Sequence, residues 1–428
     1  MNQNLFDFIS ACPTPFQAVE TVSSVLEDAG FIRLEEFERW LIDRGGKYYV
    51  TRNDSSLVAF YVPEDEFNGF MITASHDDSP CFKIKTNPEV TENGYIRISS
   101  EGYGGMLCAP WLDRPLSVAG RVAVRAGEGF RMVNVDLVDP CLVIPSVAIH
   151  MNREANNSAS FNKAIDMIPL YCSEDGTVPP LLTVIADKMG VPEDDIISTD
   201  LFVYNPQHGI QWGDYISAPR LDDLQCVYAC LQGFLNSAPD NSLPVFCMFD
   251  NEEVGSTTKQ GADSSFLTDV INGICDSLHI GENAKRRHIA LSMMISADNA
   301  HAVHPNHPEY RDKNHSVYMN KGIVVKYNAN QKYTSDSVST ALFKGVCERA
   351  GVPVQYYANR ADMAGGGTLG NISNSHLSLN TVDIGLPQLA MHSSWETAGA
   401  FDTEYLASAI SEFYNLAIQR DGNVYRLI

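Results

Sequence analysis

Five apolar residues run directly into four polar ones at Val245-Phe246-Cys247-Met248-Phe249-Asp250-Asn251-Glu252-Glu253, and Val254-Gly255-Ser256 follows. The apolar part predicts a short buried strand. Burying four polar residues at its end costs too much free energy unless cations or hydrogen bonds compensate. Taken alone, the polar part is also typical of a solvated acidic loop.

Similar apolar runs recur along the chain and alternate with amphipathic stretches. Buried-type strands are expected at residues 47–51, 57–62, 70–74, 245–249, 289–295 and 354–357. Helices are expected from Thr14-Pro15 to Gly30, from near Asp222, and over residues 335–350 and 402–418. This alternation indicates an α/β domain with a mixed, mostly parallel sheet between helices.

The pattern of the sequence changes between Pro88 and Tyr204. Residues 120–143 alternate in β fashion around the turn Gly127-Glu128-Gly129, and an Asn-rich polar stretch follows at residues 152–162. A β-rich unit is therefore expected to interrupt the α/β domain. The predicted division is 1–88 for the first segment of the α/β domain, 89–210 for the insert and 211–428 for the second segment.

Four further runs are dense in His, Asp and Glu, and each follows a strand or begins a helix. They are His76-Asp77-Asp78, Arg220-Leu221-Asp222-Asp223, residues 296–305 and residues 389–396. Each alone has an ordinary explanation: a chance His-x-Asp, an Asp at a helix N-cap, or a histidine satisfied in the core. Because ligands bind at the carboxyl ends of strands in open α/β sheets, the runs are expected to converge. Two histidines and three carboxylates form a mixed N/O set that suits two zinc ions, with Mn²⁺ or Co²⁺ as alternatives.

Composition limits the class of protein. The formal net charge is −23, which disfavours nucleic acid and anionic membranes as partners. Ten cysteines lack CxxC pairs, and the N-terminus shows no secretory signal. A cytoplasmic protein with reduced thiols is expected.

These motifs resemble those of the M18 aminopeptidases, the aspartyl aminopeptidase group. The matching stretches keep the family order and span nearly the whole chain, at residues 74–80, 111–116, 220–224, 249–256, 296–298, 301–305 and 387–393. The resemblance implies the following roles: His76, Asp222 and Asp298 for one metal, Asp222, Glu253 and His392 for the other, Glu252 as general base, and Asp78 as the carboxylate that orients His76.

The resemblance also implies a proteolytic domain interrupted by a dimerisation domain, and assembly into a tetrahedral homo-dodecamer. His150 is then expected to enter the active site of a neighbouring subunit. Lys326, Tyr333 and His301 match contacts to the substrate, with Lys326 matching the residue that reaches an acidic side chain. Three positions depart from the family pattern: Asp77 for a usual Thr, Asp223 for a usual Asn, and Gly367 where Ser is common.

The predicted reaction removes N-terminal residues from short peptides, with Asp or Glu preferred. Two metals activate a water, and Glu252 takes its proton and passes it to the leaving amine. The alternatives are an aminopeptidase of broad or neutral specificity, an M42-like aminopeptidase, an M20-like carboxypeptidase or deacylase, and a non-catalytic assembly or cargo-binding protein.

Overall fold

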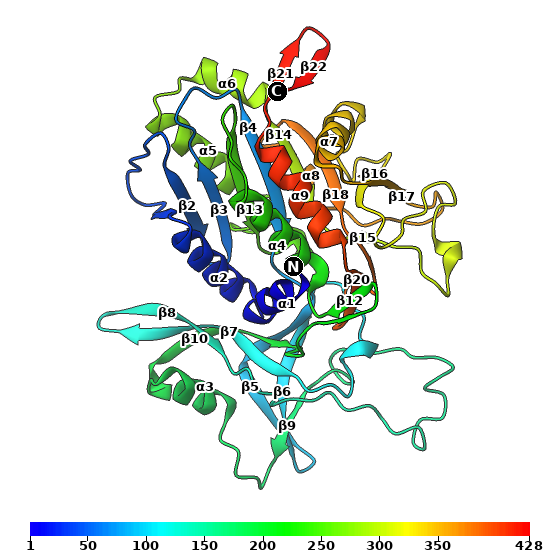
Figure 1. The fold of residues 1–428 in the computed structure, drawn as a ribbon. Coiled ribbons are helices and arrows are strands. Elements are labelled where there is room, and N and C mark those ends of the chain that lie inside the picture. Colours follow the sequence, from blue (N-terminus) through cyan, green and yellow to red (C-terminus); the bar gives the residue numbers. More distant parts are fainter.

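A nine-stranded sheet forms the centre of the larger part of the molecule in a computed structural model that describes residues 1–428 (Figure 1). Five of its pairings are parallel and three are antiparallel, so the expectation of a mixed, mostly parallel sheet is confirmed. The strands in sheet order are β1 (Ile32–Leu34), β2 (Lys47–Arg52), β3 (Ser56–Tyr61), β13 (Leu243–Phe249), β4 (Phe70–His76), β14 (Met293–Ala297), β18 (Asn380–Gly385), β16 (Ile323–Tyr327) and β17 (Val354–Ala358).

Helices cover both faces of this sheet. One face packs in a core of 50 buried residues with α1 (Asn2–Ala11), α2 (Pro15–Asp28), α4 (Leu221–Leu235), α7 (Ser337–Ala350) and α9 (Asp402–Tyr414). The other face packs in a core of 24 buried residues with α5 (Phe266–Ser277) and the ends of α8 (Leu369–His376), and α6 (Glu282–Ala290) lies beside it. The strand β13 contributes to both cores because successive side chains of a strand point to opposite faces. Phe246 and Met248 belong to the first core, and Cys247 between them belongs to the second.

A six-stranded antiparallel sheet forms the second part, drawn below the central sheet in Figure 1. Its strands in order are β8 (Gly129–Asp136), β7 (Ser117–Ala126), β10 (Ile196–Tyr204), β5 (Cys81–Glu92), β6 (Tyr95–Tyr103) and β9 (Leu170–Ser173), with α3 (Leu181–Met189) packed on it. The predicted boundary at residue 88 falls inside β5. The pairing of β5 with β6 shifts register between Ile84 and Glu89, and this bulge breaks the alternation of the strand just before Pro88.

A five-stranded sheet lies beside the central one and carries part of the site. Its order is β11 (Ile210–Trp212), β12 (Tyr215–Ala218), β20 (Glu396–Gly399), β19 (Pro387–Leu389) and β15 (Ala300–His301). A small hairpin of β21 (Ile418–Asp421) and β22 (Val424–Leu427) ends the chain. None of the helices is both long enough and apolar enough to span a membrane.

Two expected elements have different limits. Ile289 lies in α6 and the strand β14 begins only at Met293, because the short apolar run 289–295 has no periodicity that separates a helix end from a strand. The last helix ends at Tyr414, and Ile418 instead begins β21, where it is buried as it would be in a helix. The ten cysteines form no disulfide.

Candidate active site

Three neighbouring parallel strands bring the polar runs to one edge of the central sheet. The strands β13, β4 and β14 are adjacent, and they end at Phe249, His76 and Ala297. The residues at these ends therefore meet, as predicted for the carboxyl ends of parallel strands. The first turn of α4 adds Asp222, and the turn between β19 and β20 adds His392.

The first cluster forms around His76, which is 1% exposed. Its Nε2 atom lies 3.5 Å from Oδ1 of Asp222 and 4.0 Å from Oδ1 of Asp298. On the other side of the ring, Nδ1 lies 3.1 Å from the Asp78 carbonyl oxygen and 3.4 Å from its Oδ1. A histidine held through Nδ1 directs the lone pair of Nε2 into the cluster.

The second cluster forms around His392. Its Nε2 atom lies 3.4 Å from Oδ2 of Asp222 and 3.4 Å from Oε1 of Glu253. Its Nδ1 atom contacts the Gly105 carbonyl oxygen at 2.6 Å, which fixes the ring in the same sense as in His76. Asp222 thus offers one oxygen to each cluster.

Two oxygens in these clusters have no hydrogen-bond partner although they are buried: Oδ1 of Asp222 and Oε1 of Glu253. Buried polar atoms in proteins are nearly always paired, so two buried oxygens that face imidazole nitrogens without a hydrogen bond leave room for a shared cation. The donor set of imidazole nitrogens and carboxylate oxygens suits zinc. The residues present therefore fit a pair of divalent cations.

The charged groups of the two clusters shift one another's pKa values. Although burial acts to raise it, the imidazoles of His392 and His76 beside its two oxygens hold the pKa of Asp222 well below its usual range. Although burial acts to lower it, Asp222 and Glu253 raise the pKa of His392 to about 10. The negative charge that holds a proton on His392 also attracts a cation to the same place.

Glu252 faces the same space but is not part of either imidazole–carboxylate contact. Burial raises the pKa of Glu252 to about 7, and the charges of Asp298 and Asp78 act in the same direction. A carboxylate with a pKa near neutral pH can both accept and return a proton. Its backbone N–H donates to Oδ1 of Asp78 at 3.0 Å, so the orienting carboxylate also fixes this turn.

A cavity of about 360 Å³ opens over the two clusters. Among its lining residues are all the predicted metal ligands, together with Glu252, His301, Lys326 and Tyr333. His150 is absent from it and lies exposed in a turn of the six-stranded-sheet part, so its expected role in a neighbouring subunit stays a prediction.

Lys326 is the buried cation of this cavity, with 3% of its surface exposed. Its Nζ donates to the Asn299 carbonyl at 2.8 Å and lies 3.4 Å from Oδ2 of Asp298. Burial acts to lower the pKa of Lys326, but the charges around it, that of Asp298 foremost, together hold that pKa above its usual value. Burial and the charge of Lys326 lower the pKa of His301. The cavity therefore places the fixed positive charge of Lys326 beside an imidazole that resists protonation.

Three residues that support the site were not predicted. Tyr103 donates its hydroxyl to Oδ2 of Asp78 at 2.6 Å, and Gly105 contributes the carbonyl that contacts His392. Glu396 is buried and accepts from the backbone N–H groups of Asp222, at 3.0 Å, and of His392, at 2.7 Å. Glu396 is the acidic residue at the end of the run 389–396, and its presence in that run was the signal that could have identified it. A glycine carbonyl gives no signal in the sequence.

Comparison with known proteins identifies the family. Residues 8–414 match the family described as Aminopeptidase I zinc metalloprotease (M18). The chain is 45% identical over 424 residues to a probable M18 family aminopeptidase 2 of Clostridium novyi, which covers 96% of this chain and 98% of that protein. It is 41% identical over 425 residues to a protein of the same description from Pseudomonas savastanoi pv. phaseolicola, covering 97% of this chain and 98% of that protein.

Solved structures agree with this result. A chain in the cryo-EM structure of the Ape4 and Nbr1 complex superimposes with a TM-score of 0.92 at 33% identity, covering 96% of this chain and 85% of that one. The S. cerevisiae mApe1 dodecamer gives a TM-score of 0.83 at 28% identity, covering 96% and 95%. Because the match extends over nearly the whole chain, the protein belongs to the M18 family of metallo-aminopeptidases, which are hydrolases.

Proposed function

We propose that the protein is a two-metal aminopeptidase in which Asp222 would offer one oxygen to each of two zinc ions. His76 and Asp298 would be the other ligands of one ion, and Glu253 and His392 those of the other. The observation that supports this most strongly is the placement of Asp222, whose two oxygens lie 3.5 Å and 3.4 Å from the Nε2 atoms of two different histidines. When bound, the two cations supply Lewis acidity, which lowers the pKa of a water and polarises the scissile carbonyl.

Glu252 is the proposed general base. It lines the cavity beside both clusters, and its pKa of about 7 suits a group that takes a proton from water and returns it to the leaving amine. Asp78 is a positioning residue: it contacts Nδ1 of His76 and accepts the backbone N–H groups of Glu252 and Glu253. One carboxylate thereby fixes a ligand of each cluster and the base.

The proposed substrates are short peptides with a free N-terminal Asp or Glu. An ammonium group has three donors, and two of those on Lys326 are directed at Asn299 and Asp298. The third donor is available to a carboxylate in the cavity, where a charge-assisted hydrogen bond is strong. His301 and Tyr333 line the same cavity and are proposed to contact the substrate. Broad or neutral specificity is the second candidate, because two contacts already compensate much of the Lys326 charge.

The proposed assembly is a homo-oligomer, a tetrahedral dodecamer built from dimers through the six-stranded-sheet part. A structural neighbour is itself a dodecamer, and exposed apolar side chains gather on this part, namely Val138, Val147, Ile149, Met151 and Ile165. Light scattering tests it: a mass near twelve times 47.2 kDa is expected, and a monomer contradicts it. His150 lies in the same exposed turn and would act across that interface.

The deciding experiment is a panel of Asp-, Glu-, Leu- and Lys-aminoacyl fluorogenic substrates, with and without a chelator. Hydrolysis of Asp and Glu substrates, lost with the chelator and restored by Zn²⁺, is expected. A preference for Leu removes the acidic specificity and leaves the aminopeptidase. Release of C-terminal residues from a test peptide would instead support the M20-like reaction, and no release at all the assembly protein.

Glu252→Gln tests the base. Its metal content should match the wild type, and kcat should fall by about two to four orders of magnitude. Glu404→Gln, on the exposed side of α9, is the matched control and should leave kcat unchanged. A near-normal kcat in Glu252→Gln would show that another group moves the proton.

A further inference from the structure

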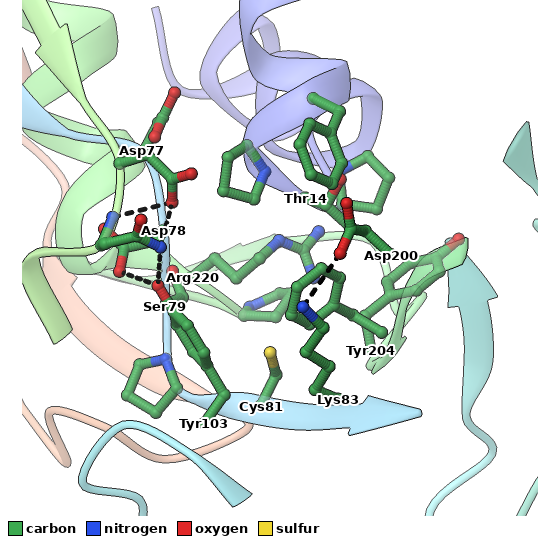
Figure 2. A pocket seen from close by; sticks show the side chains of 18 of the residues that line it. Thr14, Asp77, Asp78, Ser79, Cys81, Lys83, Tyr103, Asp200, Tyr204 and Arg220 are labelled. Carbon is green, nitrogen blue, oxygen red and sulfur yellow. Dashed lines mark hydrogen bonds and ion pairs between the residues drawn. The ribbon is translucent and has the colours of Figure 1, made fainter. Parts of the chain in front are cut away.

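A second cavity, of about 340 Å³, lies between the central and six-stranded sheets, on the other side of Asp78 from the active site. Figure 2 shows Asp77 and Asp78 at one end of this cavity and the Lys83–Asp200 ion pair at the other, with Arg220 between them. Asp222 lines both cavities, but the proposed reaction gives no role to Asp77 or Asp250.

Three carboxylates meet at the acidic end. Strands β4 and β13 are parallel with His76 opposite Phe249, so Asp77 and Asp250, one residue further along, leave the sheet side by side. The Asp77 N–H donates to the Phe249 carbonyl at 3.0 Å and fixes this arrangement. Asp77, Asp78 and Asp250 each offer one oxygen, and these oxygens lie within 4.8 Å of one another.

Asp77 gives evidence for a ligand that does not depend on the clustering of acidic residues. It is 2% exposed, it lines the cavity, and neither of its carboxylate oxygens has a hydrogen-bond partner. Asp78 and Asp250 differ in this respect: Asp78 accepts the Tyr103 hydroxyl and two backbone N–H groups, and Asp250 accepts the Asn251 N–H at 2.7 Å. A buried carboxylate with no donor at all is costly and rare.

The protein's own cations do not compensate Asp77. Lys83 and Arg121 both pair with Asp200, at 2.9 Å and 3.2 Å. Arg220 directs its Nη atoms to backbone carbonyls, and Lys259 is exposed and forms no ion pair. The negative charge at this end of the cavity is therefore available to an added cation.

We propose that Asp77, Asp78 and Asp250 form a third cation site, separate from the catalytic pair, which takes a hard divalent cation such as Ca²⁺ or Mg²⁺. All three donors are carboxylate oxygens, which are typical of sites for hard cations, whereas the catalytic clusters include imidazole. Three oxygens within 4.8 Å of one another lie at most about 2.8 Å from a common centre, so a small side-chain adjustment brings all three into the Ca²⁺ range of about 2.3–2.6 Å. The cavity has room for waters to complete the coordination.

The proposed role of this ion is positional. It would join the end of β4, which carries His76, to the end of β13, which leads into the turn that carries Glu252. It would also contact Asp78, which holds the backbone of Glu252 and Glu253. The cation would thus stabilise the turn that presents the general base without touching the substrate.

The test is a calorimetric titration of the zinc-loaded protein with Ca²⁺ and, separately, with Mg²⁺, in about 0.15 M KCl so that diffuse attraction to the acidic surface is screened. The wild type should take up about one equivalent per subunit while its zinc content stays constant. Asp77→Asn should keep its zinc and bind the added ion at least about tenfold more weakly. Asp175→Asn, on an exposed loop, is the control and should match the wild type.

Each other outcome overturns the proposal. One is a wild type that takes up no ion beyond zinc, and another is a wild type that releases zinc in step with uptake of the added ion. The others are an Asp77→Asn variant that binds the added ion as well as the wild type does, and an Asp175→Asn variant that loses as much affinity as Asp77→Asn. If Asp77→Asn does not fold, Asp250→Asn replaces it, and the wild-type titration decides without any variant. The readout is heat and metal content, so it is independent of whether the protein cleaves acidic peptides.

Discussion

Replacing Lys326 by methionine tests the acidic specificity directly. Methionine keeps most of the volume and the apolar stem but removes the ammonium group, which lies 2.8 Å from the Asn299 carbonyl and 3.4 Å from Oδ2 of Asp298. A charge-assisted hydrogen bond contributes about 1.5–3 kcal/mol, and about 1.4 kcal/mol corresponds to a factor of ten. The ratio of kcat/KM for a Glu substrate to that for a Leu substrate should therefore fall by about 10- to 150-fold.

The ratio is the informative quantity because Lys326 also contacts Asp298, a proposed metal ligand. Any change at the metals alters both substrates, and it cancels when one value is divided by the other. Lys321→Met, an exposed lysine just before the same strand, is the control and should leave the ratio within about twofold. An unchanged ratio in a Lys326→Met variant with normal zinc content would refute the role of Lys326 in recognising the acidic side chain.

Three further changes have sharp expectations. His392→Ala should lower the zinc content from two ions per subunit to about one, measured by elemental analysis, and retention of both would exclude it as a ligand. Asp336→Ala removes the N-cap carboxylate that accepts two backbone N–H groups of α7, and should cost about 1 kcal/mol of unfolding free energy in urea. Gly322→Ala should cost about 3 kcal/mol or more in the same assay, because φ is +100° and the new Cβ would lie 2.0 Å from the Pro353 carbonyl oxygen. Gly281→Ala, with open space around it, should cost far less, and equal losses would refute the steric argument.

The two ligand clusters could be predicted from the sequence because their chemistry resides in side chains at strand ends. His76 and Glu253 each follow a buried apolar run closely, and parallel pairing of β4 and β13 converts that shared position into contact. The family resemblance then divided the roles between Glu252 and Glu253, which the residues alone left open. The structure places the two on one turn with their backbone N–H groups on the same carboxylate.

The supporting contacts could not be predicted because they depend on backbone groups and on a sheet distant in sequence. Gly105 acts through its carbonyl, and Tyr103 comes from the end of β6 in the six-stranded sheet. The helix α1 was also missed, although Leu5, Phe8 and Ile9 share one buried face. That pattern covers only ten residues and has no side-chain cap, so it gave a weak signal.

Asp77 and Asp223 are the two acidic residues that depart from the family pattern. They show that counting acidic residues near a metal site does not predict what each of them does there. Asp223 is fully buried, yet its oxygens accept the backbone N–H groups of His76 at 3.3 Å and Asn299 at 3.2 Å, so it acts as a hydrogen-bond acceptor that holds two strand ends. Asp77 is as deeply buried and accepts nothing. Burial raises the pKa of both carboxyl groups, and the difference lies in their partners: Asp223 is hydrogen-bonded by the fold, and Asp77 is left for the proposed cation.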